Sequence, residues 1–434
     1  MTELAVDLYG TRVGMLSEGR GGFDFHADPD AVARYGAGSG ILSFAVPLVS
    51  RPRPGDAPLR RNFFDEVLPE GRARARLAGN ARLAPDYTVG MLARYGRDVA
   101  GALTIWDPMA PGEPRTPTSQ LADATRVRHL LEQVRSDPLG NDSLRRMSSL
   151  AGVQDKIVLA RTDEGWAEPL DGYPSTHILK PVVPAYPSLI FDEEYGARIA
   201  RELGLAAFDT WIEHFDGIAA LVIQRYDRDA ASPDGRLHQE DFNQVLGMSG
   251  DAKYEDHGHP GLAAIARVLR DRIDRSAMEQ LLRLTTMSVA VGNLDMHAKN
   301  ISVLHLPDDR ARLAPAYDIV PQTHLPVDQQ FAFAIDGVSH HSAITFGNLV
   351  NEGVRWGVRD AADVVESVLV GVRHAVATAR PLPGAHFSLA EDIDRIARHI
   401  LESRGREDAP VAAPRQSPGR YPNNAGGWGG PVRR

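Results

Sequence analysis

The change in pattern near residue 236 constrains the fold of this 434-residue chain more than any other feature. Before that point, short apolar segments of strand length predominate, and after it come long segments with the period of an amphipathic helix. These helical segments cover residues 261–271, 276–292, 360–379 and 388–403. We therefore expect an α/β part followed by a mainly helical part.

The first 105 residues predict a small α/β unit, here called the N-terminal module. Two apolar segments on either side of Tyr9-Gly10 predict a hairpin over residues 3–15. Residues 41–46 and 102–106 have the composition of two further strands, and a helical stretch is predicted to start at Phe63.

The residues up to 235 complete the predicted α/β part. Three strands are expected at 156–161, 176–181 and 219–226, and a helix over about 190–203 lies between the second and the third. The chain is thus predicted to have four regions, namely the N-terminal module, the rest of the α/β part, a helical part and a disordered tail, at 1–105, 106–235, 236–404 and 405–434.

Composition excludes several classes of site. The chain has no cysteine, which excludes disulfides, thiolate catalysis and zinc or iron–sulfur sites built on cysteine. Its formal net charge of −9 argues against binding of nucleic acid across the whole surface, although a partner can still supply DNA binding. Because no basic and apolar leader and no run of about 18 apolar residues is present, we expect no signal peptide, no membrane span and a cytoplasmic protein.

The residues that carry chemistry begin just after the helix predicted over 276–292. Asp295 and Asn300 stand five residues apart in the loop Asp295-Met-His-Ala-Lys-Asn300. A kinase catalytic loop has the same spacing, with an aspartate near the attacking hydroxyl and an asparagine that holds Mg²⁺. Alone, this spacing occurs by chance in many proteins, and His297 alone is more often a structural residue than a catalyst.

Two further charged residues lie in apolar surroundings. Lys180 ends the strand predicted at 176–181, and Asp318 lies in Tyr317-Asp-Ile-Val320. A lysine in an apolar strand needs an anion, and a buried carboxylate needs a partner such as a metal ion. The order of a lysine, the Asp–Asn pair and a second aspartate indicates phosphoryl transfer more specifically than any of its parts. A sheet-edge Lys180 and a helix-capping Asp318 are the alternative interpretations.

The segment Ser149-Leu-Ala-Gly-Val-Gln-Asp-Lys156 is a candidate phosphate loop, because backbone N–H groups of a short loop before a strand can bind phosphates. With one glycine, it matches neither the P-loop nor the G-x-G-x-x-G pattern. Metalloprotease and serine hydrolase interpretations fail, since H-E-x-x-H and G-x-S-x-G are absent. The histidine tracts at 256–259 and 340–341 have no evident third metal ligand.

Taken together, these motifs resemble the HipA family of toxin kinases. The resemblance runs in order from about residue 4 to about residue 400 and implies a two-lobed, protein-kinase-like fold of α/β plus α type. It is carried by seven elements, which are Arg61-Asn-Phe-Phe-Asp-Glu-Val-Leu-Pro-Glu70, Gly96-Arg-Asp-Val-Ala-Gly-Ala102, Ser149-Leu-Ala-Gly-Val-Gln-Asp-Lys156, Thr176-His-Ile-Leu-Lys180, Gln239-Glu-Asp241, Asp295-Met-His-Ala-Lys-Asn300 and Tyr317-Asp-Ile-Val320.

The resemblance implies a role for each matched position. Asp295 would be the catalytic base, and Asn300 and Asp318 would be the Mg²⁺ ligands. The other implied roles are completion of the catalytic loop by His297 and Lys299, binding of the ATP phosphates by Lys180, and a loop over those phosphates formed by Gly152, Val153, Gln154 and Asp155.

Three more positions follow from the same resemblance. The strand ending in Gln224-Arg-Tyr226 would be the adenine hinge, so that Gln224 and Tyr226 would contact ATP. The family often has Glu at the position of Gln224, and a backbone contact of the hinge would survive that difference. On the helix that follows Lys180, we expect Glu194 to be the ion-pair partner of that lysine.

Ser149 would be the serine that the family autophosphorylates, and the adjacent Ser148 is a second candidate. A phosphate with a charge of about −2 cannot remain in a loop that must receive the phosphates of ATP. Modification is therefore expected to move the loop and inactivate the enzyme. An unmodified hydroxyl that stabilises the turn is the alternative.

As a whole, the resemblance implies a serine/threonine-protein kinase toxin of a bacterial type II toxin–antitoxin system, with ATP and Mg²⁺ as cofactors. The implied substrate is an aminoacyl-tRNA synthetase, and the implied partner is a helix-turn-helix antitoxin of HipB type that binds the operator DNA. Two alternatives stay open, a small-molecule or lipid kinase on the same fold and a partner-binding pseudokinase. The N-terminal module argues against the former, and the intact Lys180, Asp295, Asn300 and Asp318 argue against the latter.

Overall fold

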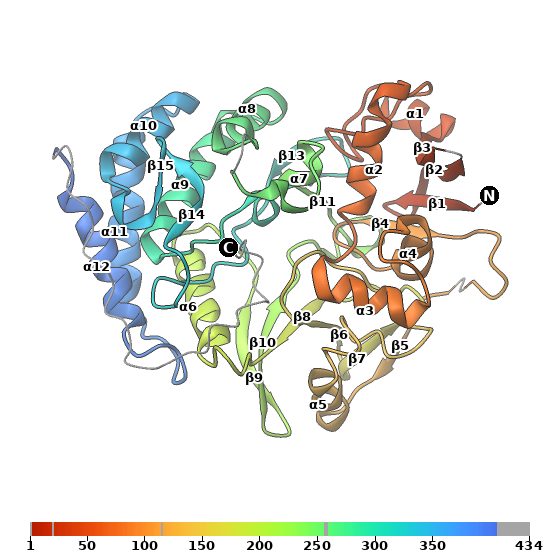
Figure 1. Cartoon of the computed structure of the whole chain (residues 1–434), viewed down its shortest axis with the longest axis horizontal. Coiled ribbons are helices and arrows are strands. Elements are labelled where there is room, and N and C mark those ends of the chain that lie inside the picture. Colours follow the sequence, from red (N-terminus) through yellow and green to blue (C-terminus); the bar gives the residue numbers. More distant parts are fainter. Residues whose placement is uncertain (1, 20, 114–115, 256–258, 406–434) are drawn as a thin grey trace.

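The structure, a computed structural model, describes residues 2–19, 21–113, 116–255 and 259–405. Strands and helices alternate in the first half of the described chain and helices dominate the second, as expected for an α/β part followed by a mainly helical part (Figure 1). The predicted tail, from residue 406 on, and residues 256–258 of the first histidine tract lie outside the described residues. No helix of the described ranges is long and apolar enough to cross a membrane.

The N-terminal module contains a four-stranded antiparallel sheet in the order β3-β2-β1-β4. Strands β1 and β2 form the predicted hairpin, and β4 lies where residues 102–106 predict a strand. The elements of the module are β1 (Glu3–Leu8), β2 (Thr11–Gly19), β3 (Gly22–Ala27), α1 (Pro29–Tyr35), η1 (Pro54–Asp56), α2 (Ala57–Asp65), α3 (Gly71–Ala81), α4 (Thr88–Tyr95) and β4 (Leu103–Trp106).

Two predictions for this module are wrong. Residues 41–46 are mostly buried but form no strand, and Glu240 from the second half of the chain binds this segment. Its carboxylate accepts hydrogen bonds from Ser43 Oγ at 2.6 Å and from the backbone N–H of Phe44 at 2.9 Å. The helix placed at Phe63 begins earlier, at Ala57, with a proline in its first turn, where a missing N–H costs nothing.

A six-stranded antiparallel sheet in the order β5-β7-β6-β8-β10-β9 forms the middle of the molecule. Strand β6 is buried on both faces of the sheet. Val158 packs into the core of the N-terminal module, while Ile157 and Leu159 pack against α5 on the opposite face. The elements are β5 (Thr118–Leu121), α5 (Ala124–Glu132), β6 (Ile157–Thr162), β7 (Gly165–Leu170), β8 (His177–Pro181), α6 (Leu189–Glu202), β9 (Thr210–Phe215) and β10 (Ile218–Gln224).

The second half packs around α9, which contacts α8, α10, α11 and α12 and is buried along most of its length. Figure 1 shows these helices, in green and blue, on the side of the molecule away from the N-terminal module. The elements are η2 (Pro233–Gly235), β11 (His238–Asp241), α7 (Phe242–Val245), η3 (Gly250–Lys253), α8 (Leu262–Arg272), α9 (Arg275–Val291), η4 (Ala298–Asn300), β12 (Ser302–His305), β13 (Ala311–Leu313), β14 (Gln330–Ile335), β15 (Val338–His340), η5 (His341–Ala343), α10 (Phe346–Trp356), α11 (Ala361–Thr378) and α12 (Leu389–Glu402).

The end of α9 determines where the predicted catalytic loop begins. Gly292 adopts a left-handed conformation (φ 71°), and its N–H bonds back to the helix, which is a common helix ending. A Cβ at this position would lie 2.5 Å from Thr323 Cγ2, so glycine is required for space as well as for conformation. The chain therefore leaves the buried helix sharply and enters the loop at Asn293.

Candidate active site

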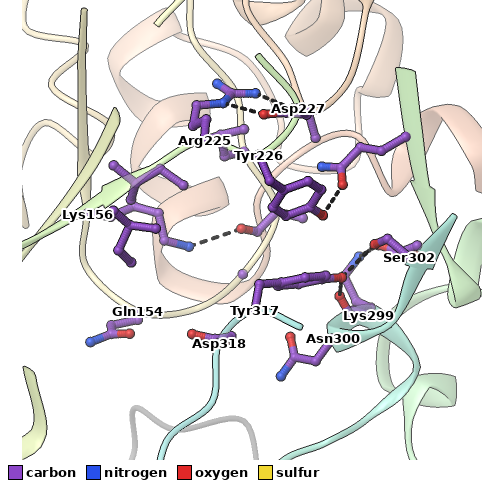
Figure 2. Close-up of a pocket in the computed structure, with 18 of the residues that line it drawn as sticks. Gln154, Lys156, Arg225, Tyr226, Asp227, Lys299, Asn300, Ser302, Tyr317 and Asp318 are labelled. Atoms are coloured by element: carbon purple, nitrogen blue, oxygen red, sulfur yellow. Dashed lines mark hydrogen bonds and ion pairs between the residues drawn. The ribbon is translucent and has the colours of Figure 1, made fainter. Parts of the chain in front are cut away.

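One cleft brings together residues of the N-terminal module, the six-stranded sheet and the helical half (Figure 2). The predicted site residues that line it are Gly152, Val153, Gln154, Lys180, Gln224, Tyr226, Asp295, His297, Lys299, Asn300 and Asp318. The predicted site residues that do not line it are Ser148, Ser149, Asp155 and Glu194.

Lys180 lies at the end of β8 with its ammonium group between two carboxylates. Its Nζ is 2.7 Å from Glu193 Oε1 and 2.6 Å from Asp318 Oδ1, and its side chain is 6% exposed. Burial opposes the charge, but the attraction of Asp318 and Glu193 outweighs it and raises the pKa of Lys180 above its ordinary value. The lysine is therefore a fixed positive charge inside the cleft.

The prediction that Glu194 pairs with Lys180 is wrong, because the neighbouring Glu193 occupies that position. Glu194 is turned along the helix and pairs with Arg198 at 2.8 Å. Successive side chains of a helix point about 100° apart. Glu193 and Glu194 therefore cannot both face β8. The rotation of α6 about its axis places Glu193 on the side that faces Lys180.

Asp318 lies in a left-handed backbone conformation (φ 55°), which is uncommon for a residue other than glycine. Burial disfavours its charge, yet the ammonium of Lys180 lowers the pKa of Asp318 to about 2. The neighbouring segment is packed tightly against α6, since a Cβ on Gly196 would lie 2.2 Å from the carbonyl oxygen of Ile319. An ionised carboxylate is thus held beside Lys180 by close backbone packing.

The loop after α9 is braced by its own side chains. Asn300 Nδ2 donates a hydrogen bond of 2.8 Å to the carbonyl oxygen of Asp295, and the N–H of His297 donates one of 2.8 Å to the same oxygen. The carboxylate of Asp295 accepts a bond of 3.0 Å from the hydroxyl of Tyr254. The carboxylate of Asp295 therefore already contacts a hydroxyl group.

His297 is buried behind this carboxylate. Its Nε2 is 3.9 Å from Asp295 Oδ2, and its ring contacts that of Tyr254 edge to face. Burial lowers the pKa of His297, which keeps the ring neutral at physiological pH. It can position Asp295, but it does not supply a positive charge.

Lys299 lines the cleft with an ammonium group that is bound by carboxylates. Its Nζ bonds Glu66 of the N-terminal module and lies 3.4 Å from both Glu70 and Asp241. Burial opposes the charge, but these carboxylates raise the pKa of Lys299 above its ordinary value. The backbone of Lys299 is held as well, since its carbonyl oxygen accepts a bond of 2.7 Å from the hydroxyl of Tyr317 (Figure 2).

The predicted phosphate loop bends over the cleft at Gly152, whose φ of 104° excludes other residues without strain. Lys156 Nζ donates a bond of 3.0 Å to the carbonyl oxygen of Ala151 and lies close to Gly152. Burial, together with repulsion from Lys180, lowers the pKa of Lys156 to about 8. Lys156 thus lines the cleft in addition to Lys180 and Lys299, and the residue patterns did not single it out although it ends the loop motif.

Asp155 is turned away from the cleft and toward two arginines. Its carboxylate is 2.5 Å from Arg72 of α3 and 3.3 Å from Arg135. The structure therefore gives Asp155 a contact that ties the loop to the N-terminal module. A direct contact with ATP stays a prediction.

Ser148 and Ser149 are buried, with 2% and 0% of their surface exposed. Ser149 Oγ donates a bond of 3.0 Å to the carbonyl oxygen of Val67, and Ser148 Oγ donates one of 3.0 Å to Asp98. Neither hydroxyl can reach a phosphate donor in this arrangement. Autophosphorylation stays a prediction that requires the loop to move.

The predicted hinge follows β10. Gln224 Oε1 accepts a bond of 3.2 Å from the N–H of Asp209, and the hydroxyl of Tyr226 bonds Gln239. Between them, Arg225 is buried in ion pairs, the shortest of which joins it to Asp227 at 2.8 Å. These contacts fix the course of the chain beside the cleft, which suits a hinge that binds a base through its backbone.

Asp318 and Asn300 supply the oxygen ligands that Mg²⁺ prefers, and Figure 2 shows both side chains on the same side of the cleft. Magnesium is usually bound by one or two carboxylates together with substrate phosphates and water. Among the residues the structure describes, no cluster of three or more His, Cys, Asp or Glu side chains could hold a metal ion. The side chains of Asp318 and Asn300 are compatible with a Mg²⁺ site of this kind.

Two family models match the chain, in the order in which its parts occur. The HipA N-terminal domain matches residues 4–106, and the HipA-like C-terminal domain matches residues 148–378. The chain belongs to the HipA family. The cleft lies where the two HipA domains meet, since the second model contains every predicted site residue and the first contains Glu66 and Glu70.

Curated relatives agree with HipA membership. The protein Y4mE of Sinorhizobium fredii, named as a kinase, is 34% identical over 296 residues, which are 66% of this chain and 70% of that protein. The serine/threonine-protein kinase toxin HipA of Shewanella oneidensis is 28% identical over 294 residues, which are 63% and 66% of the two chains.

A solved structure shows the same fold. A chain of the Shewanella oneidensis MR-1 complex of HipA, HipB and its operator DNA superposes with a TM-score of 0.72 at 23% identity. The superposition covers 92% of this chain and 97% of that chain. The prediction of a two-lobed, kinase-like HipA fold of α/β plus α type is thereby confirmed.

Sequence reasoning missed three groups of residues in this HipA site. For the partner of Lys180, sequence reasoning favoured Glu194 and not Glu193. Lys156 entered only as the last residue of the loop motif. Glu66 and Glu70 of the N-terminal module entered only as part of a motif that carries the family resemblance, without a role in the site. The signal for the last pair was present, since both lie in the motif Glu66-Val-Leu-Pro-Glu70, but no local pattern connects it to Lys299.

Proposed function

We propose that this HipA-family chain is an ATP-dependent serine/threonine-protein kinase. The observation that carries the proposal is the convergence of Lys180, Asp318, Asp295 and Asn300 on one cleft from separate parts of the chain. Phosphoryl transfer requires neutralised phosphates, an oriented metal and a base near the attacking hydroxyl. These residues can supply all three, and the relatives that are named as kinases support the same activity.

Two lysines would bind the phosphates. Lys180 now pairs with Asp318 at 2.6 Å, and a nucleotide would offer it phosphate oxygens in place of that carboxylate oxygen. Lys156 lies half-buried beside the glycine of the phosphate loop, where its charge has a backbone carbonyl as partner. Asp318, once released, and Asn300 would hold Mg²⁺, which neutralises the charge on the phosphates.

Asp295 would act on the acceptor hydroxyl. In the transfer, the oxygen of a serine or threonine bonds the γ-phosphorus, the bond from that phosphorus to the bridging oxygen breaks, and ADP leaves. The proton of the hydroxyl goes to the carboxylate of Asp295. The hydrogen bond that this carboxylate accepts from Tyr254 at 3.0 Å supports a hydroxyl-binding role.

We further propose that the chain acts in the cytoplasm as the toxin of a toxin–antitoxin pair. An aminoacyl-tRNA synthetase is the proposed protein substrate, and a helix-turn-helix antitoxin of HipB type, which would also contact operator DNA, is the proposed partner. The name of the Shewanella oneidensis relative supports the toxin role, and the solved complex of HipA, HipB and operator DNA supports the partner.

Autophosphorylation of Ser149, or of Ser148, is the proposed off-switch. Both hydroxyls are buried against the N-terminal module, so a phosphate at either position could not be accommodated in the present loop. The modified loop would have to leave the cleft, and the phosphate site would be lost with it.

The test of the kinase proposal is phosphate transfer from labelled Mg-ATP to the purified chain and to candidate synthetases. Asp295→Ala is expected to lower the transfer rate at least about a hundredfold, because a positioned base contributes roughly 10² or more to the rate. Binding of Mg-ATP, measured by calorimetry, should persist in this variant.

A matched control is Asp308→Ala, since Asp308 is an exposed aspartate that pairs with Arg310 outside the cleft. This variant should transfer phosphate like the unchanged chain. Equal transfer by Asp295→Ala would show that Asp295 is not the base. Absence of both transfer and ATP binding in the unchanged chain would instead favour a partner-binding protein without kinase activity.

A further inference from the structure

The N-terminal module reaches into the cleft through the segment 66–70. This segment connects α2 to α3, and α2 packs beside α7 of the helical half (Figure 1). Two of its side chains, Glu66 and Glu70, line the cleft. Their carboxylates are almost enclosed, with side chains that are 4% and 17% exposed.

Both carboxylates bind the loop that carries Asp295. Glu66 bonds Lys299 Nζ directly, and Glu70 Oε1 lies 3.4 Å from the same nitrogen. Lys299 directly precedes Asn300, whose side chain braces the backbone of Asp295. A shift of the lysine would therefore be passed on to both residues.

A second route leads from Glu70 to the same loop. Its Oε2 accepts a bond of 2.9 Å from Lys253, whose side chain is 3% exposed. The next residue, Tyr254, donates the hydrogen bond to the carboxylate of Asp295. The N-terminal module thus reaches the proposed base through Lys253 as well as through Lys299.

The charges explain why these contacts matter to the geometry of the loop. A buried ammonium group needs anions close to it, and the ion-pair partners of Lys299 in the described part of the chain are Glu66, Glu70 and Asp241. Two of the three come from the N-terminal module. Without them, Lys299 would turn toward Asp241 or toward water, and the loop would move with it.

We propose that Glu66 and Glu70 are positioning residues for phosphate transfer, which act through Lys299 and Lys253 on the loop from Asp295 to Asn300. This inference rests on the proposed kinase function. It makes the N-terminal module a part of the catalytic machinery, because the module supplies the anions that hold the catalytic loop in place.

The experiment uses Glu66→Gln in the full chain. The amide keeps the size of the side chain and can still accept a hydrogen bond, but it removes the charge. The turnover number is expected to fall at least tenfold while the dissociation constant for Mg-ATP stays within threefold, since neither lysine of the phosphate site contacts Glu66. Amide hydrogen exchange in residues 293–301 should become faster.

Asp24→Asn is the matched control. It removes a carboxylate of the same module that pairs with Arg60 at 2.6 Å and lies outside the cleft lining. The turnover number and the exchange of residues 293–301 should stay at the values of the unchanged chain. A loss of turnover in this control equal to that in Glu66→Gln would overturn the inference, because any weakening of the module would then suffice.

Glu70→Gln gives a second, independent reading should Glu66→Gln fail to fold, since Glu70 is the more exposed of the two. The same split between turnover and ATP binding is expected, with faster exchange at Tyr254. Unchanged turnover and unchanged exchange in a folded variant would contradict the proposal. If the unchanged chain transfers no phosphate, the kinase proposal itself fails, and the exchange measurements still show whether the module holds the loop.

Discussion

Three of the lysines that line the cleft have different partners. Lys180 lies between Glu193 and Asp318, Lys299 lies among carboxylates of two parts of the chain, and Lys156 has a backbone carbonyl as its hydrogen-bond partner. A buried ion pair is weak evidence for stability, because the cost of desolvation offsets the attraction. These pairs are better understood as an arrangement that keeps charges in place for a ligand.

Lys156 predicts a pH dependence of nucleotide binding. Its pKa is about 8 in the free protein, whereas Lys180 has a raised pKa and stays charged. Bound phosphates favour the charged form of Lys156, so binding is strongest below pH 8 and weakens as the pH rises through 8. Between pH 7 and pH 9, the dissociation constant for Mg-ATP should rise by roughly tenfold.

Calorimetry across that range checks the prediction, with Lys156→Gln as the comparison. The variant should bind more weakly at pH 7 and show a nearly flat profile up to pH 9. If the dissociation constant of the variant still rises above pH 8, the titrating group is not Lys156.

At the scale of elements, the position of α6 depends on Gly196. This helix carries Glu193, and its backbone lies so close to Ile319 that a side chain at Gly196 has no room. Gly196→Ala should therefore destabilise the protein by about 1–3 kcal/mol, as overpacking does, even though alanine favours a helix. Because Asp318 directly precedes Ile319, a shift of this segment would displace the Asp318 carboxylate. Gly196→Ala should therefore also weaken Mg-ATP binding.

Denaturant unfolding measures the first effect and calorimetry the second. Gly79→Ala is the matched control, since Gly79 also lies in a helix but a Cβ there meets no atom within 4 Å. That variant should gain up to about 1 kcal/mol and bind nucleotide normally. Equal stability of the two variants would mean that α6 can shift without cost.

The elements also show how far local patterns predict structure. The helix expected over 276–292 is α9, Arg275–Val291, because its apolar period is long and Gly292 ends it. The strand expected at 41–46 is absent, since the partner that determines its course is Glu240, nearly 200 residues away. The spacing of apolar residues can indicate that a segment is buried, but it does not show what that segment packs against.

The same limit applies to the site. Spacing indicated Asp295, Asn300, Lys180 and Asp318, which do line one cleft. It could not choose between Glu193 and its neighbour, because that choice depends on the rotation of a helix against a sheet. Nor could it connect Glu66 to Lys299, since the two are 233 positions apart and meet only in the folded chain.

At the scale of the whole molecule, the cleft is the place where three parts of the chain meet. The six-stranded sheet supplies Lys180, the helical half supplies Asp295 and Asp318, and the N-terminal module supplies Glu66. Binding of a ligand in such a place stabilises the whole fold by mass action, by about 2.7 kcal/mol at a hundred times the dissociation constant. Mg-ATP is therefore expected to protect all three parts together.

We propose that this cleft is a magnesium–nucleotide site, and calorimetric titration with ATP is the decisive experiment. The unchanged chain should bind one ATP per molecule, and omission of Mg²⁺ or the change Asp318→Asn should weaken binding at least about tenfold, or roughly 1.4 kcal/mol. Asp308→Asn should bind like the unchanged chain. Two results would show that the cleft is not a magnesium–nucleotide site. One is binding that is equally tight without Mg²⁺ and in Asp318→Asn, and the other is no binding by the unchanged chain.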